Sequence, residues 1–135
     1  MNFTAVSVAG IIILVFILGM LLLVKVMVPS EDDWIKNSKG VYVKHGNPAL
    51  TPVYVREQQD AINCSSELYQ QKKNSFLNFS SQCLGDCNDY SIDIVHVPRT
   101  DEDNKQENQC SSYLQGKTSR FIELDKNGEI QKIFN

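Results

Sequence analysis

The stretch that decides the fold is RFIELDKNGEIQKIF, residues 120–134. Apolar side chains are interleaved with polar ones in each half, which is typical of a half-buried β-strand. The dipeptide Asn127-Gly128 separates the halves, and Asn-Gly between alternating segments is a strong hairpin signal. We therefore predict two antiparallel strands joined by a two-residue type I′ turn, with both Asn127 and Gly128 at positive φ.

Two further strands are predicted upstream of this hairpin. Ile92–Val97 is rich in β-branched residues and is followed by Pro98, which ends a strand. Val41–Val43 alternates over a shorter length. Residues 75–90 are dominated by Ser, Asn, Gly and Asp and are predicted to be a loop, and residues 99–109 are entirely polar.

A long helix is predicted between these strands. It begins with Thr51 as N-cap and Pro52 in the first position, or at about Val55, and runs to about Asn74. Apolar residues recur on one face at three- and four-residue spacing: Ala61, Ile62, Cys64, Leu68 and Tyr69. The fold class expected is α+β, with one main helix packed on a three- or four-stranded, mostly antiparallel sheet.

An apolar run, residues 5–28, precedes this domain and contains a single charge, Lys25. As a helix it would be roughly 36 Å long, enough to cross a bilayer core of about 30 Å. The domains predicted are a transmembrane anchor over 1–28, a juxtamembrane linker over 29–40 and an exterior domain over 41–135. The alternative is a cleaved signal peptide, which normally has a basic start and a shorter apolar core.

The location of the domain is predicted from its cysteines. Lys25 alone favours a cytoplasmic domain by the positive-inside rule. Four cysteines in a small domain indicate disulfides, which require an oxidising compartment, and this evidence is stronger. We therefore expect a single-pass protein of the cell membrane with its C-terminal domain outside, contacting the bilayer through residues 5–28.

Four cysteines allow three disulfide pairings. A bond between Cys83 and Cys87 would close a very short loop, whereas Cys87 can reach the helix face that carries Cys64. Cys83 then pairs with Cys110 and restrains the segment with the fewest apolar side chains. We prefer this arrangement. The alternatives are the pairs 64–110 and 83–87, or the third possible arrangement.

The candidate binding residues are His96, Arg99, Asp103 and Asn108, at the end of the predicted strand and in the polar segment after it. A histidine, an arginine and a carboxylate together can support acid–base chemistry. No nucleophile motif or pair of metal-binding carboxylates accompanies them, so binding is the preferred interpretation and catalysis is not expected.

Cys83 and Cys87 form a C-x₃-C motif, which resembles the copper-binding motif of membrane-anchored Sco-type proteins. Thiolates suit Cu(I), so thiol-redox or copper handling by this pair is the alternative function. The motif lies in a polar loop without a preceding βαβ unit, which favours structural disulfides. No metal or other cofactor is expected.

Three groups of segments, taken together, resemble small single-pass membrane-anchored proteins predicted from uncultured archaea and bacteria with small genomes. They are Asp33-Trp34 with Val41–Pro48; Asp93–Arg99 with Asp103-Asn104 and Glu107–Cys110; and Phe121–Asp125 with Gly128. Lys36-Asn37 departs from that group, in which a cysteine often follows the tryptophan. The resemblance implies an anchored exterior domain and implies no activity.

Composition excludes several functions. The chain has 135 residues, 13 basic against 16 acidic side chains and a net charge of −3, with no basic cluster that would neutralise nucleic-acid phosphates. Its length excludes large α/β enzyme folds. The function expected is non-enzymatic binding or scaffolding at the cell surface, with a protein as partner.

Overall fold

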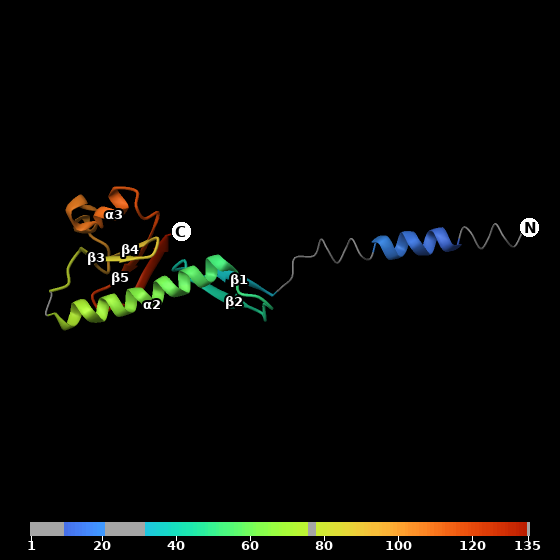
Figure 1. Cartoon of the computed structure of the whole chain (residues 1–135), viewed down its shortest axis with the longest axis horizontal. Coiled ribbons are helices and arrows are strands. Elements are labelled where there is room, and N and C mark those ends of the chain that lie inside the picture. Colours follow the sequence, from blue (N-terminus) through green and yellow to red (C-terminus); the bar gives the residue numbers. More distant parts are fainter. Residues whose placement is uncertain (1–9, 21–31, 76–77, 135) are drawn as a thin grey trace, which may run out of the picture. The chain divides into compact units, whose positions relative to one another are not determined.

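The computed structural model describes residues 10–20, 32–75 and 78–134 (Figure 1). The chain divides into two units, Met1–Glu31 and Asp32–Asn135. In the first unit, residues 10–20 are helical. The second unit contains the long helix, both disulfides and all the strands that the structure describes, and the features discussed below belong to it.

The predicted membrane-spanning helix over residues 5–28 is contradicted. No helix in the described part of the chain is both long enough and apolar enough to cross a bilayer. A spanning helix requires about 20 consecutive, mainly apolar residues. Residues 5–9 and 21–28 of the predicted span lie outside the described residues. The fold class is therefore corrected to an α+β protein with two sheets and two disulfides.

The main sheet has four strands in the order β3-β4-β5-β6. They are β3 (Gln82–Cys87), β4 (Tyr90–Ile94), β5 (Arg120–Leu124) and β6 (Ile130–Phe134). The two outer pairs are antiparallel and the central pair, β4 with β5, is parallel. The predicted loop over 75–90 is wrong in its second half, because β3 gains backbone hydrogen bonds from β4 that its polar composition does not reveal.

The hairpin between β5 and β6 is confirmed, but its turn differs from the prediction. The N–H of Gly128 donates to the carbonyl of Asp125 (2.9 Å), and the N–H of Asp125 donates to the carbonyl of Glu129 (2.9 Å). Only Gly128 has positive φ (+83°), and Asn127 does not. This is a three-residue loop with a left-handed glycine, which is the usual alternative to type I′. The longer loop fits the register shift in the β5–β6 ladder.

Helix α2 (Val53–Asn74) covers one face of the main sheet. Thr51 is not its cap: Pro52 holds the N-cap position, and its carbonyl accepts from the N–H groups of Val55 and Arg56. Successive strand residues point to opposite faces, so the buried apolar positions of β4 and β5 pack beneath α2. These core residues are Tyr90, Ile92, Ile94, Ile122 and Leu124, joined by Ala61 and Tyr69 of the helix.

A second, two-stranded sheet begins in the segment predicted to be a linker. Strand β1 (Asp33–Lys36) pairs antiparallel with β2 (Tyr42–His45), which contains most of the predicted strand over 41–43. Trp34 is buried in the domain, and its indole N–H donates to the carbonyl of Leu50 (3.1 Å). The compact unit begins at Asp32 and therefore includes β1, which lies in the second half of the segment predicted to be a linker.

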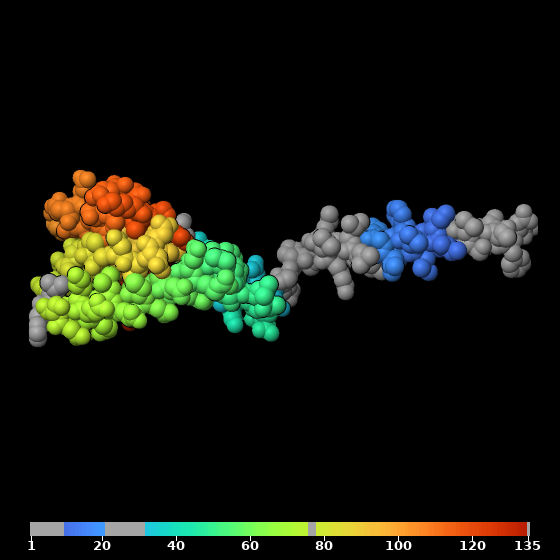
Figure 2. Space-filling view, viewed as in Figure 1, coloured from blue at the N-terminus to red at the C-terminus, as the bar shows by residue number. Residues whose placement is uncertain are grey.

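The opposite face of the main sheet is covered by the crossover that joins the parallel strands β4 and β5. It contains the 3₁₀-helices η1 (Asp101–Asn104) and η2 (Gln106–Asn108) and the short helix α3 (Ser111–Leu114). Parallel neighbours require such a crossover. Figure 2 shows this segment, in orange, and α2, in green, on opposite sides of the yellow strands.

Polar side chains of the sheet lie under this crossover. The hydroxyl of buried Ser91 is 2.7 Å from the hydroxyl of buried Thr118 and donates to the Asp86 carboxylate at 2.9 Å. Asp93 and Glu123 lie on the same face, side by side in the β4–β5 register. The sheet therefore has an apolar face toward α2 and a hydrogen-bonded polar face toward the crossover.

The disulfides join Cys64 to Cys87 and Cys83 to Cys110, which is the pairing preferred from the sequence. The first connects α2 to the end of β3, and the second connects β3 to the crossover. Each face of the sheet therefore has one covalent link to the layer that covers it.

Candidate functional site

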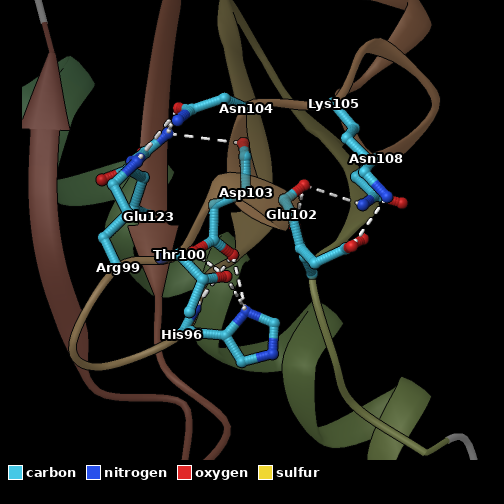
Figure 3. Close-up of polar contacts among 10 residues, drawn as sticks. His96, Arg99, Thr100, Glu102, Asp103, Asn104, Lys105, Asn108 and Glu123 are labelled. Carbon is cyan, nitrogen blue, oxygen red and sulfur yellow. Dashed lines mark hydrogen bonds and ion pairs between the residues drawn. The ribbon is translucent and has the colours of Figure 1, made fainter.

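The segment that follows β4 positions the candidate site. After Ile94, the N–H of Val95 donates to the carbonyl of Leu124 (2.8 Å), which continues the pairing with β5 by one residue. The chain then turns at Val97-Pro98 and enters η1. Figure 3 shows His96 beside Asp103 in this turn, with Arg99 directed toward Asn104 and Glu123. The prediction of a strand over 92–97 therefore placed its end three residues too late.

Asp103 is the centre of the turn. Its side chain is buried, and its two carboxylate oxygens accept hydrogen bonds from the backbone N–H of Thr100 (2.7 Å) and the backbone N–H of His96 (3.0 Å). Thr100 and Asp103 also form a capping box at the start of η1. Burial alone raises the pKa of Asp103, but the hydrogen bonds from Thr100 and His96 outweigh it and lower the pKa to about 2.

The imidazole of His96 is oriented by the same carboxylate. Its Nδ1 lies 2.9 Å from Oδ1 of Asp103, and 39% of its side chain is exposed. Because Asp103 is ionised above pH 2 and can only accept, Nδ1 carries the hydrogen. The other ring nitrogen, Nε2, points away from Asp103 in Figure 3.

His96 lines a cavity of about 520 Å³, which we call the His96 cavity. Its apolar walls are formed by Phe79, Ile94, Val95, Val97 and Pro98. Thr100 and the β5–β6 turn, through Asp125, Lys126 and Asn127, contribute the polar rim. Small-molecule sites have this volume range and this combination of apolar walls with a few converging polar groups.

Arg99 points in the other direction and ties the turn to the sheet. Its guanidinium makes an ion pair with Glu123 of β5, whose side chain is only 8% exposed. It also donates to the side-chain oxygen of Asn104 (3.1 Å) and to the carbonyl of Asp103 (3.4 Å). An ion pair with one buried partner is costly to break, so Arg99 holds the turn in place.

Asn108 has a structural contact in the same segment. Its amide donates to the carbonyl of Glu102 (2.9 Å), which also accepts from the hydroxyl of Ser81 (3.2 Å). Asn108 lines a second cavity, of about 240 Å³, together with Arg99 and Asp103. The structure therefore brings His96 and Asp103 into direct contact, and places Arg99 and Asn108 on the opposite side of the turn.

Sequence reasoning missed two carboxyl groups of this second cavity, Asp93 and Glu123. Each alternates with buried apolar residues in its strand, a pattern that ordinarily indicates a side chain in solvent. Burial, together with the charge of Glu123, raises the pKa of Asp93 to about 7. The sequence held one signal for this second cavity, namely an acidic residue in each of two predicted strands. The two carboxyl groups become buried because the crossover segment covers the sheet face on which they lie.

The cysteines do not offer a metal site. Within the described residues, the one cluster of possible ligands is Cys83, Asp93 and Cys110, whose ligand atoms lie within 4.8 Å of one another. Both sulfurs are bonded to each other and have no thiolate to donate. Cys83 and Cys87 of the C-x₃-C motif belong to different disulfides, so in this structure they are not paired with each other.

The fold and the site define a small disulfide-bonded α+β domain with a cavity on either side of one rigid turn. Comparison of the chain with protein-family models, with curated proteins and with solved structures finds no match in any of the three. The function is therefore argued from the site alone.

Proposed function

We propose that the chain is an extracytoplasmic domain that binds, without chemical conversion, a ligand in the His96 cavity. The observation that carries this proposal is the cavity itself: apolar walls, one oriented imidazole and a volume of about 520 Å³. The two disulfides support an oxidising compartment.

The lining favours a ligand with an apolar body and a neighbouring hydrogen-bonding group. Phe79, Val95 and Val97 offer apolar surface. The imidazole of His96 is held by Asp103 through Nδ1, which leaves Nε2 for one polar contact with the ligand. A side chain of an extended peptide, flanked by its own amides, has this chemistry. We therefore infer that the natural ligand is a peptide segment with an apolar side chain.

Binding is favoured over hydrolysis by the position of the Thr100 hydroxyl group, which contacts the imidazole of His96. An Asp–His pair acts as a base through Nε2, where the nucleophile must lie. Thr100 contacts the imidazole, but its hydroxyl is 3.1 Å from Nδ1, the nitrogen that faces Asp103. This hydroxyl is engaged with the buried carboxylate and cannot be activated by Nε2.

The proposal is tested by NMR titration with N-acetyl-leucinamide and N-acetyl-phenylalaninamide, with N-acetyl-serinamide as the polar comparison. The chain has two histidines, His96 and the exposed His45, so their ring signals are readily assigned. We expect the apolar probes to shift the His96 ring and the backbone of 94–100 and 125–127, with Kd of about 1–10 mM. The serine probe should bind at least about fivefold more weakly.

The matched variants are His96→Ala and His45→Ala. The first should weaken binding of the leucine probe by about fivefold or more, through loss of the directed contact, and the second should leave it unchanged. Equal shifts at both histidines, or no shift in the cavity at 20 mM probe, would reject the proposal.

A further inference from the structure

Asp93 is a half-buried carboxyl group that the binding proposal does not use. It lies on β4 and faces the crossover. The charged groups around it are Glu123 on β5, Asp86 on β3 and Arg99 in the turn, and the backbone N–H of Cys110 donates to it. Desolvation and then Glu123 raise its pKa to about 7, against the lowering effects of Cys110 and Arg99. Its proton reaches solvent through the 240 Å³ cavity.

This carboxyl group lies against a disulfide. Its Oδ1 is 3.2 Å from Sγ of Cys110, which is fully buried, whereas Cys83 at the other end of the bond is partly exposed. An external thiolate therefore meets the Cys83 end first, and Cys110 is the leaving group. A thiolate left at Cys110 would be buried beside carboxyl groups, which is unfavourable unless a proton arrives.

We propose that Asp93 is the proton donor for opening of the Cys83–Cys110 disulfide by an external dithiol. One thiolate of the dithiol attacks Sγ of Cys83 and forms a mixed disulfide, and the electron pair of the broken S–S bond moves to Sγ of Cys110. Asp93 transfers its proton to that sulfur and becomes a carboxylate. The second thiolate of the dithiol then displaces Cys83, so the dithiol is oxidised and both cysteines are reduced.

The sign of the pH dependence follows from this step. Below the pKa of Asp93 the proton is present and the site carries less negative charge. Above it, the carboxylate cannot protonate Cys110 and repels both thiolates. The rate constant per external thiolate therefore decreases as the pH rises through about 7.

The chain contains its own control. The second disulfide also joins a partly exposed cysteine, Cys64, to a buried one, Cys87. Among the described residues, no carboxylate forms with Cys64 and Cys87 a cluster like that of Asp93 with Cys83 and Cys110. Its rate constant per thiolate should be independent of pH.

The experiment reduces the full chain with dithiothreitol between pH 5.5 and 8.5. Samples are quenched with acid and alkylated, and each disulfide is followed separately by peptide mass mapping. We expect the normalised rate constant for Cys83–Cys110 to fall at least about tenfold across this range, with no change for Cys64–Cys87. Asp93→Asn should remove the pH step, and Asp101→Asn, an exposed carboxylate in η1, should keep it. The same pH profile for both disulfides, or a step that survives in Asp93→Asn, would overturn the proposal.

A second variant keeps the test decisive if Asp93→Asn does not fold. Burial is the main cause of the raised pKa of Asp93, and the charge of Glu123 is the next. Glu123→Gln removes that second cause, so the midpoint of the pH step should move to lower pH. An unmoved midpoint in a folded Glu123→Gln protein contradicts the assignment to Asp93.

Discussion

Gly128 lies at a position where both backbone conformation and space exclude a side chain. Its φ is +83°, and a Cβ atom there would lie 2.6 Å from the ring of Tyr69. That ring is buried in the core, and its hydroxyl donates to the carbonyl of Lys126 (2.9 Å) in the same turn. The turn therefore packs directly against Tyr69 of α2.

Gly128→Ala should lower the free energy of unfolding by about 2 kcal/mol or more, since it combines backbone strain with a steric clash. Gly116→Ala is the matched control: its φ is +68°, but no atom lies within 4 Å of the added Cβ. The control should cost only about 1 kcal/mol. Urea unfolding measures both, and equal losses would show that the Tyr69 contact is unimportant.

Asp103 makes the free energy of unfolding depend on pH in the acid range. Its pKa is about 2 in the folded chain against an ordinary value of 3.8, so its contribution is complete above pH 4 and is lost as the pH falls toward 2. The difference corresponds to about 2 kcal/mol. Asp103→Asn should therefore be less stable at pH 6 and should lose less stability between pH 5 and 2. Urea titrations check this, with Asp101→Asn as the control; an unchanged slope in Asp103→Asn would refute the assignment.

At the scale of elements, α2 depends on its attachments. It has no side-chain hydrogen bond at its N-cap and no acidic residue in its first turn. Its position is set by core contacts, by the Tyr69 hydroxyl and by the Cys64–Cys87 bond to β3. The covalent bond is the one attachment that also restricts the unfolded chain.

Replacing Cys64 and Cys87 together by alanine should lower the free energy of unfolding by about 3 kcal/mol, the loop-closure value for a separation of 23 residues. Urea unfolding under non-reducing conditions measures the change, and far-UV circular dichroism shows whether α2 persists. A loss below about 1 kcal/mol would mean that the core contacts alone hold the helix on the sheet.

At the scale of the molecule, the two sheets are linked through backbone groups. The N–H of Ile133 donates to the carbonyl of Lys39 (2.8 Å), which joins β6 to the β1–β2 turn. Buried Gln58 of α2 donates to the carbonyl of Gly40 (2.9 Å) and accepts from the N–H of Tyr42 (2.8 Å). These contacts make the small sheet part of the same folding unit.

Residues 32–135 alone should therefore fold and unfold in one cooperative transition. Trp34, the single tryptophan, reports on the small sheet, and far-UV circular dichroism reports on α2 and the main sheet. The two signals should give the same urea midpoint. Separate midpoints would mean that the small sheet unfolds independently.

Several features of this molecule were determined by the sequence itself. The β5–β6 hairpin follows from local alternation around Asn127-Gly128, and α2 follows from its apolar spacing. The sequence also named His96 and Asp103 as candidate residues only seven positions apart, although it did not predict their direct contact. The sequence left three disulfide pairings open, and the one it favoured is the pairing observed.

Only the tertiary structure decided the environment of the sheet's second face. β3 exists because β4 supplies its hydrogen bonds, and Asp93 and Glu123 are covered because the crossover to β5 passes over them. Local alternation specifies which residues share a face but not what covers it. The burial that shifts the pKa of Asp93, and its approach to Cys110, come from segments distant in sequence, whose packing is fixed only when the whole domain has folded.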